Sequence, residues 1–414
     1  MKFKKRNVSL PVRRLGGLVG FLIAITLGLQ PPAQVEAKTE SPWKPNERVP
    51  GYADETYTPF IVADQDHYVH AFATQWTGSG VRNGVVYRKW SLEAGWTTPV
   101  DILLSPIESD AVIQGVYLDP TGMFHLLFFS GERTRKYIYY SQARVEEAAS
   151  ARAWSTPTII GTQAIDPSYA AISGDAQGNL VVIYSGNIAG GGVYSVYSTD
   201  SGSTWSNPET VFLTRDSRNV PFSLRIFPGQ NNTVHAAWNV VTNLGADISL
   251  HYARYDLVEH RWNQPTTLNQ KTGGGVGSFG PSYPSLVDTG KQVIVFYNSG
   301  NPYPNLPVEQ GRPMQVVSIS NDNGDTWTPP FIPFNRHQGR SGENTMALDG
   351  ENIPHALFIQ RVQMTENGEE RVIGGIWHSE FKDGIWSNPE RFITNYPPHD
   401  VRAVVVQGNV LFAV

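Results

Sequence analysis

The chain has 414 residues, a formal charge of −5 and no cysteine. A net-acidic protein is a poor candidate for sequence-independent binding to a phosphate backbone, so we expect no nucleic-acid partner. The absence of cysteine excludes disulfides, thiol catalysis, a lipoprotein anchor and any cysteine-based metal site.

Residues 1–37 have the three parts of a secretory signal peptide. A basic stretch ends at Arg14, an apolar run extends from Leu18 to Leu29, and Val35-Glu36-Ala37 offers small residues for cleavage. The apolar run is shorter than the roughly 20 residues that span a bilayer. We therefore expect an exported protein, secreted or periplasmic. An uncleaved anchor is the alternative, and only in that case would the membrane be a partner.

Beyond the signal peptide, the sequence Trp-x-x-Pro occurs six times, with 51 to 65 residues between successive copies. The copies start at Trp96, Trp154, Trp205, Trp262, Trp327 and Trp386. A spacing this regular indicates repeated structural units, and residues that recur with the repeat are expected to serve the fold before any chemistry.

Each repeat divides into four short apolar segments bounded by Gly, Pro, Asn and Asp, which is typical of strands. Residues 60–64 are an example of the first segment, 69–72 of the second and 137–141 of the third; the fourth follows Trp-x-x-Pro. Units of four strands that repeat every ~40–50 residues are typical of a β-propeller. Proline fits the outermost strand of a blade, because that strand is an edge.

The strand count predicts an all-β propeller over residues 58–414, with six complete blades and a partial seventh. Seven first strands, seven second strands and six third strands can be identified. The seventh first strand is Ala403–Gln407, and the seventh second strand is Asn409–Val414. Residues 38–57 form an N-terminal segment, in which Trp43-Lys44-Pro45 could supply an outer strand that closes the ring.

Two turns before the fourth strand are especially regular: Ser198-Thr199-Asp200-Ser201-Gly202-Ser203-Thr204-Trp205 and Ser320-Asn321-Asp322-Asn323-Gly324-Asp325-Thr326-Trp327. We expect Asp to bond the backbone ahead of it, Gly to adopt positive φ, and Trp to pack under the turn. The pattern resembles the Asp-box, or BNR repeat, of the sialidase (neuraminidase) superfamily. The resemblance implies a sialidase-like propeller whose Asp-boxes lie on the face opposite the active site.

The resemblance also implies a chemistry. Sialidases hold a sugar carboxylate with three arginines and use a Tyr nucleophile backed by Glu, with an Asp as acid/base. The family's Phe/Tyr-Arg-Ile-Pro motif is absent here, and the nearest sequence is Leu224-Arg225-Ile226-Phe227. Candidate site residues are therefore chosen by their position in the repeat and not by motif.

The connections between strands differ in length on the two faces. Turns between first and second strands are tight, whereas loops on the other face are long, and long loops on a rigid scaffold usually carry function. Arginine is concentrated on the long-loop face, and arginine suits two-point binding of a carboxylate. Two interpretations stay open: a solvated rim of Arg–Asp/Glu pairs, or a cluster that binds anions.

The candidate substrate-binding residues are Arg225, Arg361 and Arg402, with Arg312 in reserve. Arg225 and Arg402 open first strands beside the central channel, and Arg361 ends a second strand. The candidate catalytic residues are Tyr297, Glu343 and Asp110: Tyr297 ends a second strand, as Tyr184 does, while Glu343 and Asp110 precede first strands.

His70, His125, His235 and His355 recur at one position of the second strand. Because the repeat places them in different blades, they predict a structural role such as an interblade hydrogen bond, and we expect no metal and no cofactor. The function predicted is recognition of an extracellular glycan or other anionic ligand, with exo-sialidase-like hydrolysis as the enzymatic form. The alternative is a non-catalytic propeller that binds a protein partner.

Overall fold

The computed structural model divides into two units, Met1–Lys44 and Pro45–Val414, and the strands of the described residues belong to the second. The residues described are 43–51, 56, 59–76, 82–132, 135–165, 169–216, 218–272, 279–301, 313–334, 337, 339, 341–366, 369–393 and 400–414. The side chains of residues 361–372 lie outside this description. The proposed signal peptide also lies outside it. Residues 43–49 form no strand, and whether residues 38–57 close the ring stays a prediction.

The first three blades are antiparallel sheets whose strands follow one another along the chain. Blade 1 contains β1 (Phe60–Ala63), β2 (Val69–Trp76), β3 (Asn83–Ser91), β4 (Gly95–Trp96) and β5 (Val100–Leu103). Blade 2 contains β6 (Val112–Leu118), β7 (Met123–Glu132), β8 (Arg135–Arg144) and β9 (Thr158–Thr162), with the 3-10 helices η1 (Val145–Glu147) and η2 (Ala151–Ala153) before β9. Blade 3 contains β10 (Ala170–Gly174), β11 (Leu180–Gly186), β12 (Gly192–Ser198) and β13 (Glu209–Leu213).

The remaining sheets repeat this order with local variations. Blade 4 contains β14 (Val220–Pro228), β15 (Thr233–Val241), β16 (Asp247–Asp256), β17 (Arg261–Trp262) and β18 (Thr266–Gln270). Blade 5 contains β19 (Ser282–Asp288), β20 (Val293–Ser299) and β21 (Met314–Ser320), and an isolated bridge between Val317 and Phe331 replaces its fourth strand. Blade 6 contains β22 (Ser341–Leu348), β23 (Pro354–Glu366), β24 (Glu369–Lys382), β25 (Ile385–Trp386) and β26 (Glu390–Ile393), and a last sheet pairs β27 (Ala403–Val406) with β28 (Val410–Ala413).

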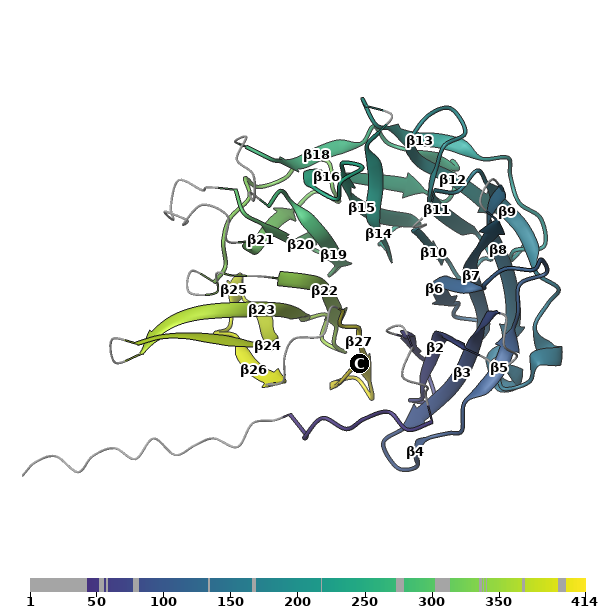
Figure 1. The fold of residues 1–414 in the computed structure, drawn as a ribbon, viewed down its shortest axis with the longest axis horizontal. Coiled ribbons are helices and arrows are strands. Elements are labelled where there is room, and N and C mark those ends of the chain that lie inside the picture. Colours follow the sequence, from purple (N-terminus) through teal and green to yellow (C-terminus); the bar gives the residue numbers. More distant parts are fainter. Residues whose placement is uncertain are drawn as a thin grey trace, which may run out of the picture. The chain divides into compact units, whose positions relative to one another are not determined.

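The first strand of every blade faces the centre of the second unit, as Figure 1 shows for β6, β10, β14, β19 and β22. Each first strand contacts the next one along the chain, and β27 contacts both β22 and β1. The two-stranded sheet β27–β28 therefore lies between blade 6 and blade 1. This arrangement confirms the predicted all-β propeller of six blades and a partial seventh.

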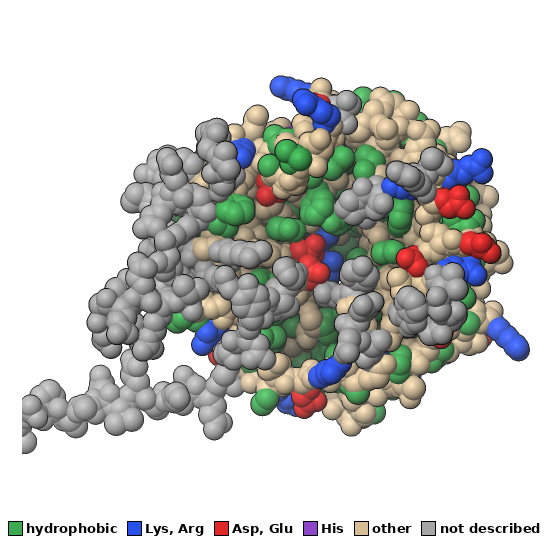
Figure 2. Space-filling model, in the orientation of Figure 1, with side chains coloured by type: hydrophobic (Ala, Val, Ile, Leu, Met, Phe, Trp, Pro, Cys, Tyr) green, Lys and Arg blue, Asp and Glu red, His purple; other side chains and the backbone are tan. Residues whose placement is uncertain are grey.

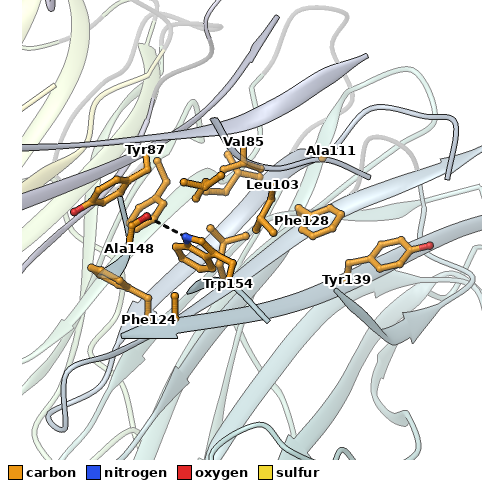
Figure 3. Packing of buried hydrophobic residues seen from close by; sticks show 14 residues of the cluster. Val85, Tyr87, Leu103, Ala111, Phe124, Phe128, Tyr139, Ala148 and Trp154 are labelled. Atoms are coloured by element: carbon orange, nitrogen blue, oxygen red, sulfur yellow. Dashed lines mark hydrogen bonds between the residues drawn. The ribbon is translucent and has the colours of Figure 1, made fainter. Parts of the chain in front are cut away.

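The hydrophobic core is a series of clusters between neighbouring blades. In the cluster between blades 1 and 2, Phe72 packs edge-on against Phe124 and Trp154, with ring centroids 5.1 and 5.9 Å apart. The indole Nε1 of Trp154 donates to the carbonyl of Ala148 at 3.0 Å, which satisfies its buried polar atom (Figure 3). Alternation along the strands places one face of each sheet in such a cluster.

The two regular turns have the same hydrogen bonds. The Ser198 hydroxyl accepts from the Gly202 amide at 2.9 Å, Asp200 accepts from the Thr204 amide at 2.8 Å, and the Trp205 indole donates to the Gly202 carbonyl at 3.2 Å. The second turn repeats these bonds at 2.8, 2.8 and 3.1 Å. The expected roles of Asp, Gly and Trp in these turns are confirmed.

Three of the four recurring histidines contact a tyrosine on the third strand. Nδ1 of His70 lies 2.8 Å from the Tyr87 hydroxyl, and the same contact is 2.7 Å for His125 with Tyr140 and 2.6 Å for His235 with Tyr252. Their other ring nitrogens face aspartates, which are Asp64, Asp119 and Asp288. Asp288 is in blade 5 and His235 in blade 4, so this one contact crosses between blades. The structural role predicted for these three residues agrees with their contacts.

Candidate functional site

Several inner strands carry a β-bulge close to where they begin. One extra residue lies between Phe222 and Arg225 on β14, between Ser282 and Ser285 on β19, and between Ser341 and Asn344 on β22. Bulges redirect side chains and are frequent beside functional sites. Two bulge residues other than glycine have positive φ, namely Ser223 at 49° and Tyr283 at 50°. Because this conformation is costly for a bulky residue, it marks the position as one with a special demand.

Glu343, in the bulge of β22, joins two arginines from other parts of the ring. Its Oε2 lies 2.6 Å from Arg225 Nη2 on β14 and 3.4 Å from Arg402 Nη2, just before β27. The Glu343 side chain is 11% exposed, and each arginine side chain is 18% exposed. Burial by itself raises the pKa of Glu343, but the two guanidiniums outweigh it and hold that pKa below its ordinary value.

Arg402 is fixed on several sides. Its guanidinium carbon lies 4.8 Å from the centre of the Phe60 ring, a cation–π contact, and its backbone exchanges two hydrogen bonds with Val414. Burial and the neighbouring Arg225 lower the pKa of Arg402, although a guanidinium stays protonated. The Arg402 Nε is buried and finds no hydrogen-bond acceptor among the residues described.

Two tyrosines belong to the same group. Tyr169 precedes β10 and Tyr283 lies in the bulge of β19, and the ring of Phe222 lies between them, 4.3 Å from Tyr169 and 6.2 Å from Tyr283. Burial raises the pKa of Tyr169, and the charges of Glu343 and Asp400 add to the effect. Burial, Asp247, Glu343 and Asp400 raise the pKa of Tyr283 to about 12. Both phenols are therefore neutral at neutral pH.

Asp247 is the most perturbed carboxyl near the group. It opens β16, and its Oδ1 accepts a hydrogen bond from Asn239 Nδ2 at 2.9 Å. Burial raises the pKa of Asp247 to about 7, because hydrogen bonds from Asn239 and Ser282 and the charge of Lys271 offset the burial only in part. A carboxyl that exchanges its proton near neutral pH can act as an acid or as a base.

We refer to Tyr169, Arg225, Tyr283, Glu343, Asp400 and Arg402 as the channel cluster. Arg225 lies after the bulge within β14, Tyr283 and Glu343 lie near the starts of β19 and β22, and Tyr169, Asp400 and Arg402 lie just before β10 and β27. These are inner strands of successive blades. Figure 2 shows acidic and basic side chains side by side near the middle of this face, at a hollow in the surface. Two guanidiniums and two phenols are suited to hydrogen bonding an anionic, hydroxyl-rich ligand, whereas the guanidiniums disfavour a metal ion at this place.

The structure brings three of the predicted site residues together, namely Arg225, Glu343 and Arg402. Tyr297 is completely buried in the hydrophobic cluster between blades 4 and 5, and its hydroxyl accepts from Asn269 Nδ2 at 3.0 Å. Tyr184 is equally buried and donates to the Thr162 carbonyl at 3.3 Å. Both environments are those of structural tyrosines, because a second-strand side chain on that face packs between blades.

Asp110 accepts a hydrogen bond from the Asn83 amide at 2.7 Å and so ties the segment before β6 to the start of β3. Arg361 pairs with Gly374 through the β23–β24 ladder, and its side chain lies outside the described part. Arg312 lies outside the described residues altogether. The rim interpretation fits Arg218, whose exposed side chain pairs with Asp216 at 2.7 Å.

Tyr169, Tyr283, Asp400 and Asp247 were not among the predicted catalytic residues. A signal for the two tyrosines was present, because each stands at the start of a first strand, the same position that selected Arg225 and Glu343. The bulge that directs Tyr283 has no sequence signature, since its positive-φ residue is not glycine. Asp400 and Asp247 looked like ordinary polar residues at strand starts.

No family model and no curated protein matches the sequence. Among solved structures, an ulvan lyase of polysaccharide lyase family PL25, bound to -[GlcA(1-4)Rha3S]-, aligns with 83% of this chain and 84% of its own. The TM-score is 0.53 at 10% identity, which shows a shared propeller fold and nothing finer.

Sialidases also occur among the structural neighbours. The NanB sialidase from Streptococcus pneumoniae aligns with 83% of this chain and 69% of its own at a TM-score of 0.48 and 9% identity. The Hadza microbial sialidase Hz136 aligns with 73% of this chain and 63% of its own at a TM-score of 0.44 and 13% identity.

Proposed function

We propose that the protein is an exported propeller of the sialidase type that binds an acidic glycan at the channel cluster. The observation that carries this proposal is that Arg225 and Arg402, from different sheets of the ring, both contact one oxygen of Glu343. The two guanidiniums lie side by side in a partly buried place, and a carboxylate is the group that their forked donors fit.

Hydrogen-bond donors and not net charge carry the recognition. Glu343 and Asp400 balance the two guanidiniums in charge, so the cluster produces no large positive field. Arg402 retains a buried Nε–H without an acceptor among the described residues. A ligand carboxylate that accepts this N–H satisfies a buried donor, which favours acidic over neutral sugars.

Family membership and export belong to the same proposal. The Ser-x-Asp-x-Gly-x-Thr-Trp turns with their repeated hydrogen bonds support an Asp-box propeller. The basic and apolar segments before residue 38 support export by a signal peptide. The glucuronate-containing ligand bound to the ulvan lyase supports an acidic sugar as the ligand of a similar fold.

Glycoside hydrolysis is the catalytic form of this proposal. Among the neighbouring charges, Glu343 raises the pKa of Tyr169 most, and Asp247 raises the pKa of Tyr283 most. In such a reaction the Tyr169 oxygen attacks the anomeric carbon while Glu343 accepts the phenol proton. The bond to the leaving oxygen breaks as Asp247, protonated in part at neutral pH, donates a proton to that oxygen. Water then attacks the anomeric carbon and gives a proton to Asp247, while the bond to Tyr169 breaks and Glu343 returns its proton to the phenol oxygen.

Binding is tested first, by titration calorimetry with N-acetylneuraminic acid and glucuronic acid, with glucose as the neutral control. We expect an acidic sugar to bind, and Arg402→Gln to weaken its binding at least tenfold. Arg218→Gln is the matched control, because Arg218 is exposed and paired with Asp216 away from the cluster. Equal binding of neutral and acidic sugars, or full affinity in Arg402→Gln, contradicts the proposal.

Catalysis is tested separately, by release of the fluorophore from an aryl sialoside between pH 4 and 8. We expect turnover to be abolished in Tyr169→Phe, which removes only the hydroxyl, while acidic-sugar binding remains. Binding without turnover in the wild type would leave a glycan-binding propeller. If the protein shows neither binding nor turnover, the protein-interaction alternative is favoured.

A further inference from the structure

The second-strand histidine of blade 6 has a neighbour different from that of its counterparts. In blades 1, 2 and 4 the third-strand residue two positions before the histidine's cross-strand partner is a tyrosine. In blade 6 it is His378, whose Nε2 lies 2.9 Å from His355 Nδ1. The register is the same in each case, because His378 pairs with Leu357 as Tyr140 pairs with Leu127.

A second replacement occurs at the neighbouring position of the same blade. The residue directly opposite the histidine is Lys89 in blade 1, Gln142 in blade 2 and Arg254 in blade 4. Opposite His355 it is Glu380, whose Oε1 lies 3.9 Å from His355 Nδ1. Blade 6 therefore departs from the shared pattern twice, and both departures introduce a metal-ligating side chain.

We propose that His355, His378 and Glu380 form a binding site for a divalent transition-metal ion such as Zn²⁺. The candidate ligand atoms all lie within 4.8 Å of one another. Two ligand atoms on a tetrahedral zinc ion, each about 2.0–2.1 Å from the metal, stand about 3.3 Å apart. The distances of 2.9 and 3.9 Å bracket this value, and the half-exposed Glu380 side chain would move towards the two imidazoles to close on the ion.

A carboxylate stands behind one ligand. Asp349 Oδ2 lies 3.5 Å from His355 Nε2, and Asp349 Oδ1 accepts from the amides of Glu351 and Ile353 at 2.9 and 2.8 Å. A proton on His355 Nε2 facing Asp349 leaves the Nδ1 lone pair to accept the hydrogen bond from His378 Nε2, and a metal ion would replace the proton between these two nitrogens. This carboxylate–histidine arrangement orients metal ligands in many proteins.

The site is open to solvent on one side. The Glu380 side chain is 46% exposed, whereas His355 is 12% exposed. An ion can therefore enter from solvent past the carboxylate, and water can complete the coordination. Among the described residues no other three His, Asp or Glu side chains gather so closely.

The consequence for the fold is a cross-link between β23 and β24. The turn that carries Asp349 continues into Gly350, whose amide donates to the Gly408 carbonyl in the turn between β27 and β28. An ion at this site would thus stabilise blade 6 next to the sheet that completes the ring, on the turn side away from the channel cluster. The inference is independent of the proposed glycan function.

The test is titration of the full exported chain, made without a polyhistidine tag and stripped with a chelator, with Zn²⁺ followed by calorimetry. We expect one equivalent to bind, and Co²⁺ to give the visible absorption of a tetrahedral site. His378→Tyr restores the residue of blades 1, 2 and 4, and Glu380→Gln introduces the residue of blade 2. Both variants should fold normally and weaken Zn²⁺ binding at least tenfold.

Thermal unfolding of the metal-free proteins checks the fold of both variants, and Zn²⁺ should raise the unfolding temperature of the wild type only. Absence of stoichiometric binding to the wild type would overturn the inference. So would undiminished affinity in both variants, which would place the ion elsewhere. Since Glu380 is half exposed, its substitution remains informative even if His378→Tyr folds poorly.

Discussion

At the residue scale, Asp247 shows how strongly this fold can alter a single carboxyl. The residue lies at the start of β16 with an amide and a hydroxyl as partners, yet burial prevails and raises its pKa to about 7. In the unfolded chain the same carboxyl titrates near 3.8. The folded protein therefore binds a proton that the unfolded protein has released over the whole interval between these values.

The sign of the resulting pH dependence follows directly. The protonated Asp247 contributes its stabilisation fully below pH 3.8, and that contribution is lost as the pH rises towards 7. We expect Asp247→Asn to remove this part of the pH dependence. The advantage of the variant over the wild type in free energy of unfolding should grow by roughly 2–4 kcal/mol as the pH rises from 4 to 8. Urea unfolding at pH 4, 6 and 8 measures it.

The control for this prediction is Asp101→Asn on β5, an exposed carboxyl whose substitution should leave the pH profile of stability unchanged. Parallel pH profiles for wild type and Asp247→Asn would show that Asp247 is ionised in the folded protein at neutral pH. That result would also withdraw Asp247 from the role of proton donor.

The same scale shows how far the site could be predicted. Glu343 and Arg402 could be selected because each stands where a first strand begins, and first strands line the channel. Arg225 was selected on the same ground, but β14 begins at Val220, so the expectation that Arg225 opens the strand was wrong. The prediction that Tyr297 faces the channel was wrong, because its side chain on the second strand is buried in the hydrophobic cluster between blades. Tyr283 was not predicted because a one-residue bulge determines the direction of its side chain. The alternation of side chains along a strand predicts that direction only where no bulge is present.

At the element scale, the regular turns depend on their glycines for two reasons. Gly202 has a φ of 83°, and a Cβ at this position would overlap the hydroxyl end of Tyr140 in the preceding blade. Gly324 has a φ of 89° and the same relation to Tyr252. These tyrosines are the partners of His125 and His235, so each turn packs on the histidine–tyrosine pair of its neighbour.

We expect Gly202→Ala to lower the free energy of unfolding by more than the cost of placing alanine at positive φ. An alanine with positive φ costs about 1–2 kcal/mol, and displacement of the buried Tyr140 adds to this. Gly384→Ala is a matched control within the same chain, because Gly384 has a φ of 81° and open space around its Cα. Chemical unfolding of both variants measures the difference.

The difference between the two variants separates packing from conformation. Equal destabilisation in Gly202→Ala and Gly384→Ala would mean that the contact with Tyr140 contributes nothing beyond the glycine conformation. The strands around these turns could be predicted well, because Trp-x-x-Pro and the alternating apolar runs recur with the repeat. The dependence of one blade's turn on the preceding blade's tyrosine could not, since only a contact in space reveals it.

At the scale of the whole molecule, the ring is completed by a sheet of only two strands. β27 contacts both β22 and β1, and the loop before it supplies Asp400 and Arg402 to the channel cluster. The Arg402 backbone is held by Val414, beyond β28. The last strands therefore support the ring and position one half of the arginine pair.

Phe412 is the side chain that joins this closing sheet to blade 1. Its ring lies 4.5 Å from that of Trp90 and 5.7 Å from that of Trp96, both in blade 1. We expect Phe412→Ala to lower the free energy of unfolding by about 2–3 kcal/mol, less than for a fully buried phenylalanine because Phe412 is half-buried. Calorimetry should show one transition at a lower temperature, because blades joined in a ring unfold together. Leu244→Ala, at a side chain that is 90% exposed, should leave the transition in place. A split transition in Phe412→Ala would instead mean that the closing sheet unfolds on its own. The position of Arg402 would then depend on that sheet and not on the rest of the ring.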